Sequence, residues 1–181
     1  MIDYLSIIKK YYSPESDGYK LLVEHSKQVA DLAITLAHRR PELNIDYDFV
    51  YEAAMLHDIG IFKTHAPSIH CHGELPYICH GYLGRELLDS LGLHKHALVC
   101  EHHTGAGLSK SNIIEQKLPL PERDMLPTTL EEKLVCYADK FFSKSKIRSA
   151  KPFEKVHNDM CKFGADTLER FDEMASIFGT P

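Results

Sequence analysis

The most constraining feature of this sequence is an apolar stripe with helical spacing that includes a histidine. Between residues 19 and 39 the positions of the stripe follow one another at intervals of three and four residues. This spacing places them on one face of an α-helix, and such a face normally packs into the core of a domain. The positions are Leu22, His25, Val29, Leu32 and Leu36. A long amphipathic helix is therefore predicted, with an imidazole on its buried side.

Other segments repeat this helical pattern, and none shows the alternation of a convincing β-strand. Residues 60–78 and 108–127 are rich in Pro and Gly and are expected to be irregular. Helices are expected at about 2–12, 19–39, 48–58, 79–91 and 93–103, from Thr128 or Thr129 onward, and at 153–178. The predicted fold class is all-α, with a single domain of about six to seven helices over residues 1–181 and an extended insertion at about 104–127.

Composition and charge limit the number of domains, the partners and the cellular location that we expect for this protein. The chain has 181 residues, of which 44% are hydrophobic, and this is enough for one domain with a substantial core. The net charge of -5 argues against an extended nucleic-acid surface, which needs an excess of basic residues. The sequence has no apolar run of membrane-spanning length and no signal-peptide pattern, and its five cysteines include no CxxC pair. We therefore expect a cytoplasmic protein without a membrane partner, and its oligomeric state stays open.

Twelve histidines are an unusual number, and four of them lie on the apolar stripes of four different predicted helices. Two carboxylates join them, because Asp58 directly follows one of these histidines and Asp139 points inward on a fifth helix. A single core histidine is more often a hydrogen-bonded structural residue than a ligand. Buried carboxylates among imidazoles, however, are costly unless they are paired or bind a metal. The six converging residues are His25, His57, Asp58, His80, His102 and Asp139.

The chemistry of these side chains indicates which metals they would bind, and how many. Nitrogen and oxygen ligands without thiolates suit iron, manganese, zinc or cobalt. Six ligands exceed the needs of one tetrahedral zinc ion. They suit two neighbouring ions that share a carboxylate. The residues therefore predict a two-metal centre where five helices meet.

The central residues of this set resemble a known motif. Residues 56–60 read Leu-His-Asp-Ile-Gly, which resembles the HDIG form of the central motif of the HD superfamily of metal-dependent phosphohydrolases. His25 upstream and Asp139 downstream resemble the remaining positions of that superfamily's signature. The resemblance covers about residues 20–145 and implies an all-α domain of the HD type.

The motifs around two further histidines resemble those of the branch of this superfamily that binds two metals. These histidines are His80, within Cys-His-Gly-Tyr-Leu-Gly, and His102, within Glu-His-His-Thr-Gly. The branch includes bacterial hydrolases of diadenosine tetraphosphate and uncharacterised HDIG proteins of bacteria and archaea. The stretch between His102 and Asp139 is longer here than in those hydrolases, which puts that particular substrate in doubt. His103 is the alternative to His102 as a ligand.

The resemblance implies a metal-dependent phosphohydrolase that acts on a nucleotide or another small phosphorylated metabolite, as a phosphomonoesterase or phosphodiesterase. It implies two divalent transition-metal ions, iron or manganese first and zinc, cobalt or nickel as alternatives, which activate a hydroxide. Two other functions stay open, an HD-type diiron oxygenase and a non-catalytic nucleotide-binding module. By position, one ion would be held by His25, His57, Asp58 and Asp139, and the other by Asp58, His80 and His102.

Residues near the motif are candidates for contacts with the substrate phosphate. Lys63 resembles a lysine that often follows the motif, and we predict a catalytic and substrate-binding role for it, although a solvated loop lysine is an equal alternative. In the histidine-rich loop 65–74, His65 is the preferred candidate for phosphate binding or proton donation, and a solvent-exposed imidazole is the more common alternative. Arg123 in the insertion is a further candidate. The basic residues after Asp139 suit either a helix C-terminus or a phosphate, with Lys140 preferred among Lys140, Lys144, Lys146 and Arg148.

Overall fold

The computed structural model of the chain describes residues 2–144 and 150–181, and within them it confirms the all-α fold class. The small remainder of regular structure is a set of short 3-10 helices and one antiparallel two-stranded hairpin. The α-helices are α1 (Tyr4–Lys9), α2 (Asp17–His38), α3 (Tyr47–Leu56), α4 (His80–Ser90), α5 (His94–His102), α6 (Lys110–Glu115), α7 (Leu130–Asp139), α8 (Phe153–Met160) and α9 (Ala165–Phe178). The other elements are η1 (Pro41–Leu43), η2 (Ile59–Lys63), β1 (His65–Ala66), η3 (Pro67–Ile69), β2 (Cys71–His72), η4 (Tyr77–Cys79) and η5 (Cys161–Phe163).

The described residues form nine α-helices rather than the predicted six or seven, and two segments account for the difference. The proline-rich insertion contains the short helix α6, which begins at Ser109 with a capping box completed by Asn112. The predicted last helix is divided into α8 and α9. Gly164 separates them with a φ of 110°, a value that no helical residue adopts.

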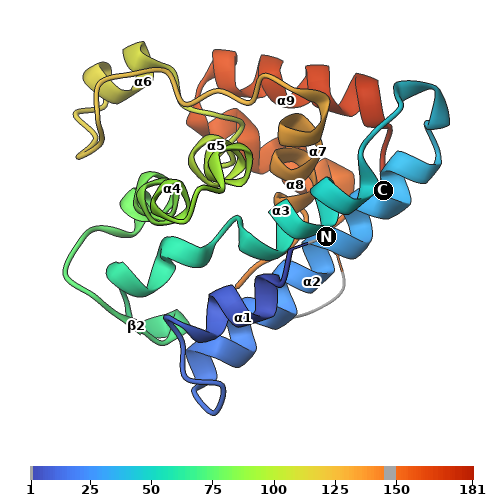
Figure 1. Cartoon of the computed structure of the whole chain (residues 1–181). Coiled ribbons are helices and arrows are strands. Elements are labelled where there is room, and N and C mark those ends of the chain that lie inside the picture. The colour runs from blue at the N-terminus through green and yellow to red at the C-terminus, as the bar shows by residue number, and fades with distance from the viewer. Residues whose placement is uncertain (1, 145–149) are drawn as a thin grey trace.

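Helix α2 is the longest element and carries the stripe that the sequence predicts. Ser16 caps its N-terminus by accepting a hydrogen bond from the backbone of Tyr19. Leu22, His25 and Val29 are buried along one face. In Figure 1, α2 lies on the opposite side of the molecule from α9, with α3 and α7 between them. Among the described residues, no helix combines the length and the apolarity that a membrane span needs.

Two groups of apolar side chains form the core, and His25 stands between them on α2. Leu22 belongs to the group that also holds Leu56 and Leu88, beneath α1, η2 and α4. Val29 belongs to the larger group around α3, α7 and α9. Polar side chains between two apolar groups are removed from water on every side. This is where the predicted metal ligands lie.

Two glycines bring η2 and α4 close together. A Cβ atom on Gly60, the last residue of the HDIG motif, would lie 2.3 Å from the carbonyl oxygen of His80 and 2.5 Å from the backbone nitrogen of Gly84. A Cβ on Gly84 would lie 2.2 Å from the sulfur of Cys100 on α5. Larger residues at either position would push these elements apart. The glycines therefore set the distance from Asp58 to α4 and α5.

The insertion at 104–127 is fastened to the helical core at both ends. Leu108 and Met125 exchange backbone hydrogen bonds of 2.9 and 2.8 Å. Arg170 of α9 donates to the carbonyl oxygens of Ala106 and Gly107 at 3.0 and 3.1 Å. These contacts hold the chain that leaves the end of α5, next to the metal-binding candidates.

Candidate metal centre

The first group of candidate ligands consists of buried side chains from α2, the end of α3 and the end of α7. His25 Nε2 lies 3.0 Å from Asp139 Oδ1 and 3.2 Å from Asp58 Oδ2. His57 Nε2 lies 3.0 Å from Asp58 Oδ2 and 3.5 Å from Asp139 Oδ1. One ligand atom from each of the four residues lies within 4.8 Å of the others. Two imidazoles and two carboxylates therefore surround one common point.

The second group adds the ends of α4 and α5 on the other side of Asp58. Asp58 Oδ1 lies 3.5 Å from His80 Nε2 and 3.4 Å from His103 Nε2. The two imidazole nitrogens are 3.1 Å apart. Asp58 thus turns one carboxylate oxygen toward each group. This is the arrangement of a carboxylate that bridges two ions.

Three of the imidazoles are oriented in the same way by the backbone. In each, Nδ1 donates to the carbonyl oxygen three residues earlier, which fixes the ring and, when the imidazole is neutral, leaves Nε2 without a proton. The Nε2 lone pair then points toward Asp58 and suits metal ligation. The pairs are His57 with Ala54 at 2.6 Å, His80 with Tyr77 at 2.7 Å and His103 with Cys100 at 2.8 Å.

Several buried polar atoms in the two groups have no hydrogen-bond partner. They are Nδ1 of His25, Nε2 of His57 and both carboxylate oxygens of Asp58. Nε2 of His57 and the ammonium of Lys144 approach Asp58 Oδ2 without the alignment of a hydrogen bond. Nε2 of His80 and Nε2 of His103, both without a proton, face each other at contact distance. Each unmet group would cost free energy in a buried site. A pair of divalent cations satisfies all of them except Nδ1 of His25, so the residues fit two metal ions.

The charge states of most of the side chains agree with this fit. Burial would lower the pKa of His57, but Asp58 and Asp139 raise it to about 9, so this imidazole must release a proton to bind a metal. Burial would raise the pKa of Asp58, but the nearby His57 and Lys144 hold it well below its usual range, so the carboxylate is ionised. Burial lowers the pKa of His80 to about 3 and also lowers the pKa of His103. Both imidazoles are therefore neutral, as metal ligands must be.

The structure corrects the choice between His102 and His103. His102 faces away from Asp58: its Nδ1 lies 2.7 Å from Glu132 Oε2, and its Nε2 lies 3.5 Å from Glu101 Oε2. Burial would lower the pKa of His102, but these two carboxylates raise it. His103 takes the place that we predicted for His102.

The reason for this error lies in the stripe chosen for α5. The prediction paired Leu98 with His102, but Leu98 is only partly buried. Val99 and Cys100 are fully buried apolar positions of this helix, and His103 follows them at intervals of four and three residues. Reading that stripe would have selected His103.

The remaining predicted contact residues occupy different places. Lys63 ends η2, His65 is exposed on β1 opposite His72, and neither belongs to the two candidate ligand groups. Arg123 pairs with the buried carboxylate of Glu101, so its guanidinium is held by the protein rather than by the site. Lys140 does reach the site, with Nζ 2.7 Å from Asp139 Oδ2. Lys146 and Arg148 lie outside the described residues.

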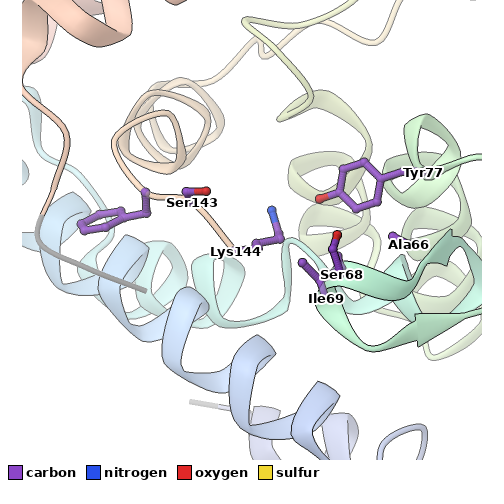
Figure 2. Close-up of a pocket in the computed structure, with 7 residues that line it drawn as sticks. Ala66, Ser68, Ile69, Tyr77, Ser143 and Lys144 are labelled. Carbon is purple, nitrogen blue, oxygen red and sulfur yellow. The ribbon is translucent and has the colours of Figure 1, made fainter. Parts of the chain in front are cut away.

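Lys144 also reaches the site, although Lys140 was the preferred candidate among the basic residues after Asp139. Its Nζ lies 2.6 Å from Asp58 Oδ2 and 6.0 Å from the centroid of the Tyr77 ring, which in turn stacks on His80 at 4.6 Å. Figure 2 shows Lys144 and Tyr77 on opposite sides of a hollow, with Ser68 and Ile69 from the hairpin region between them. Its volume is about 310 Å³. Lys144 follows α7 in a loop, where helical periodicity gives no prediction.

Comparison with known proteins identifies the family. Residues 22–143 match the model of the HD domain, and the chain belongs to the HD domain family. It is 39% identical over 138 residues to the uncharacterized protein MJ0778 of Methanocaldococcus jannaschii, covering 75% of this chain and 70% of that protein. No solved structure matches the chain.

Two further relatives are longer proteins. The tRNA (cytidine(56)-2'-O)-methyltransferase of Picrophilus torridus is 32% identical over 162 residues, and that of Thermoplasma volcanium is 30% identical over 160 residues. Each match covers 88% of this chain but only 43% and 42% of the respective methyltransferase. The chain therefore spans less than half the length of these two relatives.

Proposed function

We propose that this chain is a metal-dependent phosphohydrolase that uses two divalent transition-metal ions to hydrolyse a small phosphorylated metabolite. The observation that carries the proposal is the position of Asp58. Its two oxygens face two separate sets of imidazoles, and Oδ2 also contacts the ammonium of Lys144. Two ions held there would supply Lewis acidity and the capacity to ionise water near neutral pH.

The side chains of the site would divide the remaining tasks. His25, His57 and Asp139 would hold the first ion, His80 and His103 would hold the second, and Asp58 would contact both. Three backbone carbonyls keep the imidazoles in one orientation, so little reorganisation is needed during the reaction.

Two lysines beside the ligands suit an anionic substrate. The ammonium groups of Lys140 and Lys144 lie next to Asp139 and Asp58 in this structure. Metal ions at those carboxylates would repel the ammonium groups and leave them available for phosphate oxygens. Lysines in these places favour phosphate hydrolysis over oxygen activation, which needs no anion-binding groups.

The longer relatives suggest a second kind of substrate to include in the test. Their name describes methyl transfer to tRNA, whereas the ligand groups of this chain form a candidate metal centre. We therefore assign hydrolysis to this chain and include phosphorylated RNA ends among the substrates to be tested.

The test is turnover by protein that has been reconstituted with manganese or iron under anaerobic conditions. The panel contains nucleotides, dinucleotides, aryl phosphates and short RNAs with terminal phosphates. We expect release of phosphate or of a nucleotide from at least one class. Asp58→Ala should be inactive.

A matched control is His96→Gln, because His96 is also buried on α5 but pairs with Glu52 outside the two ligand groups. This variant should retain activity. Oxygen consumption by the iron-loaded protein without hydrolysis would instead support the diiron oxygenase. Metal-dependent nucleotide binding without turnover would support the non-catalytic module.

A further inference from the structure

A second hollow adjoins the metal centre on the side of the C-terminal segment. It has a volume of about 360 Å³, and Asp139 forms part of its wall. We call it the basic hollow. Its charged residues are Asp139, Lys140, Lys144, Lys151, Asp159 and Lys162. Phe142 and Lys144 line both this hollow and the one in Figure 2, so the two hollows are neighbours.

The basic hollow concentrates positive charge in a chain that is acidic as a whole. Four lysines line it against two aspartates, while the complete chain has a net charge of -5. One of those aspartates, Asp139, belongs to the metal centre. The other, Asp159, accepts hydrogen bonds from two lysines, at 2.6 Å from Lys162 and 3.3 Å from Lys155. The basic hollow therefore keeps a net positive charge.

Lys151 is the lysine of the hollow whose ammonium, within the described part of the chain, contacts a backbone carbonyl oxygen and not a carboxylate. Its backbone N–H donates to Phe141 and its ammonium donates to the carbonyl oxygen of Lys140, at 2.8 and 3.3 Å. These contacts fasten it beside the end of α7. Within residues 2–144 and 150–181 it forms no ion pair. A half-buried ammonium without a carboxylate partner can form a charged hydrogen bond with an anionic ligand.

The position of this hollow relative to the family match is informative. Residues 22–143 cover the HD domain, but Lys151, Asp159 and Lys162 come from the segment that follows it. The metal ligands belong to the shared domain, whereas this wall belongs to the additional segment. Such a wall can determine which substrates one member of the family accepts.

We propose that the basic hollow is a subsite for a second phosphate group of the substrate, bound by Lys151 and Lys162 while the first lies at the metal centre. This inference rests on the proposed function, and it narrows the substrate class to compounds with two phosphates. The two phosphates are either joined directly, as in an anhydride, or separated by several bonds, as in a nucleoside bisphosphate.

The test is calorimetric titration of the metal-loaded full chain with phosphonates, which this chemistry cannot hydrolyse. The probes are methylphosphonate, methylenebisphosphonate and butane-1,4-bisphosphonate, and the metal content is measured again after each titration. For the wild type, the Kd of at least one bisphosphonate should be lower than that of methylphosphonate by about tenfold or more. The reason is that charged hydrogen bonds to the second phosphonate add to the affinity. The better of the two bisphosphonates reveals how far apart the phosphates lie.

Two variants distinguish binding at this subsite from a nonspecific attraction of the anionic probe to nearby lysines. Lys151→Ala with Lys162→Ala should lose most of the gain that the second phosphonate gives. Lys155→Ala is the matched control, since Lys155 is exposed and contacts the same aspartate but does not line the hollow. It should keep the gain. If the double variant does not fold, Lys162→Ala alone changes an exposed side chain and should lose part of the gain.

The outcomes also separate this inference from the proposed function. An equal gain in the wild type and the double variant, or no gain in the wild type, overturns the subsite even if the protein hydrolyses phosphate esters. A gain that depends on the two lysines supports the subsite even if every ester in the turnover panel is left intact.

Discussion

His102 and His103 are adjacent in the chain, yet they belong to two different environments. Nδ1 of His103 donates to a backbone carbonyl, and its Nε2 faces Asp58 beside His80. Both nitrogens of His102 face carboxylates, those of Glu101 and Glu132. A neutral partner on one nitrogen leaves the other free as a ligand. Carboxylates on both nitrogens favour the protonated cation, which cannot bind a metal.

The network around His102 has a structural role that differs from that of the metal centre. Glu101 is buried and contacts Arg85 on α4 and Arg123 in the insertion. Burial would raise its carboxyl pKa, but His102, Arg123 and Arg85 lower it to about 2. The network thus connects α4, α5 and the insertion. One face of the end of α5 thus carries a candidate metal ligand, and the other carries ion pairs that connect α5 to α4 and the insertion.

The largest expected effect comes from removing the carboxylate that the two ligand groups share. Asp58→Ala should abolish binding of both ions and lower turnover by about a thousandfold or more. Metal binding also stabilises a fold by mass action. A chelator should therefore lower the Tm of the wild type and leave that of Asp58→Ala almost unchanged. An equal decrease in both proteins would contradict a buried metal centre.

The next effect separates the two neighbouring histidines. His103→Ala should reduce the metal content from two ions per chain toward one and lower turnover by about a hundredfold or more. His80→Ala should behave in the same way. His102→Ala should keep both ions. Mass spectrometry of the metal content, with circular dichroism to confirm folding, makes the comparison. Loss of the second ion in His102→Ala alone would reverse the assignment.

A smaller effect on stability is expected in the carboxylate network. Glu101→Gln removes the charge that Arg85 and Arg123 contact, and it should lower the free energy of unfolding by about 1–3 kcal/mol. The partial exposure of both guanidinium groups keeps the loss below that of a fully buried ion pair. Urea titration measures it. The metal content should stay at two ions per chain, and a loss of metal in this variant would show that the two environments are coupled.

The smallest effect is expected at the other partner of His102. Glu132→Gln keeps an acceptor for the backbone N–H of Thr128 but weakens the contact with the imidazole. The free energy of unfolding should fall by about 1 kcal/mol. The same urea titration applies. A larger decrease than that of Glu101→Gln would mean that Glu132, and not Glu101, is the main stabilising carboxylate of the network.

Helical periodicity predicted much of the site, because metal ligands on buried stripes follow the same spacing as core residues. It placed His25, His80 and Asp139 inward on helices that the structure contains, and His57 at the C-cap of such a helix. It failed for His103, which lies one residue beyond α5, where a stripe read from Leu98 pointed to its neighbour.

Contacts between distant segments were beyond the reach of sequence patterns. The pairing of Arg123 with Glu101 and the approach of Lys144 to Asp58 depend on how loops cross the helices. Neither loop has a period from which a direction can be read. The basic hollow likewise combines α7 with a segment that follows it, and only the folded chain brings its lysines together.

The most direct test of a two-metal centre bridged by Asp58 is anomalous X-ray scattering from a crystal of the manganese- or iron-loaded protein. We expect two peaks, one on each side of Asp58. His25, His57 and Asp139 should ligate one ion, and His80 and His103 the other, with His102 still between Glu101 and Glu132. A single peak, or a second ion bound by His102, would contradict this arrangement.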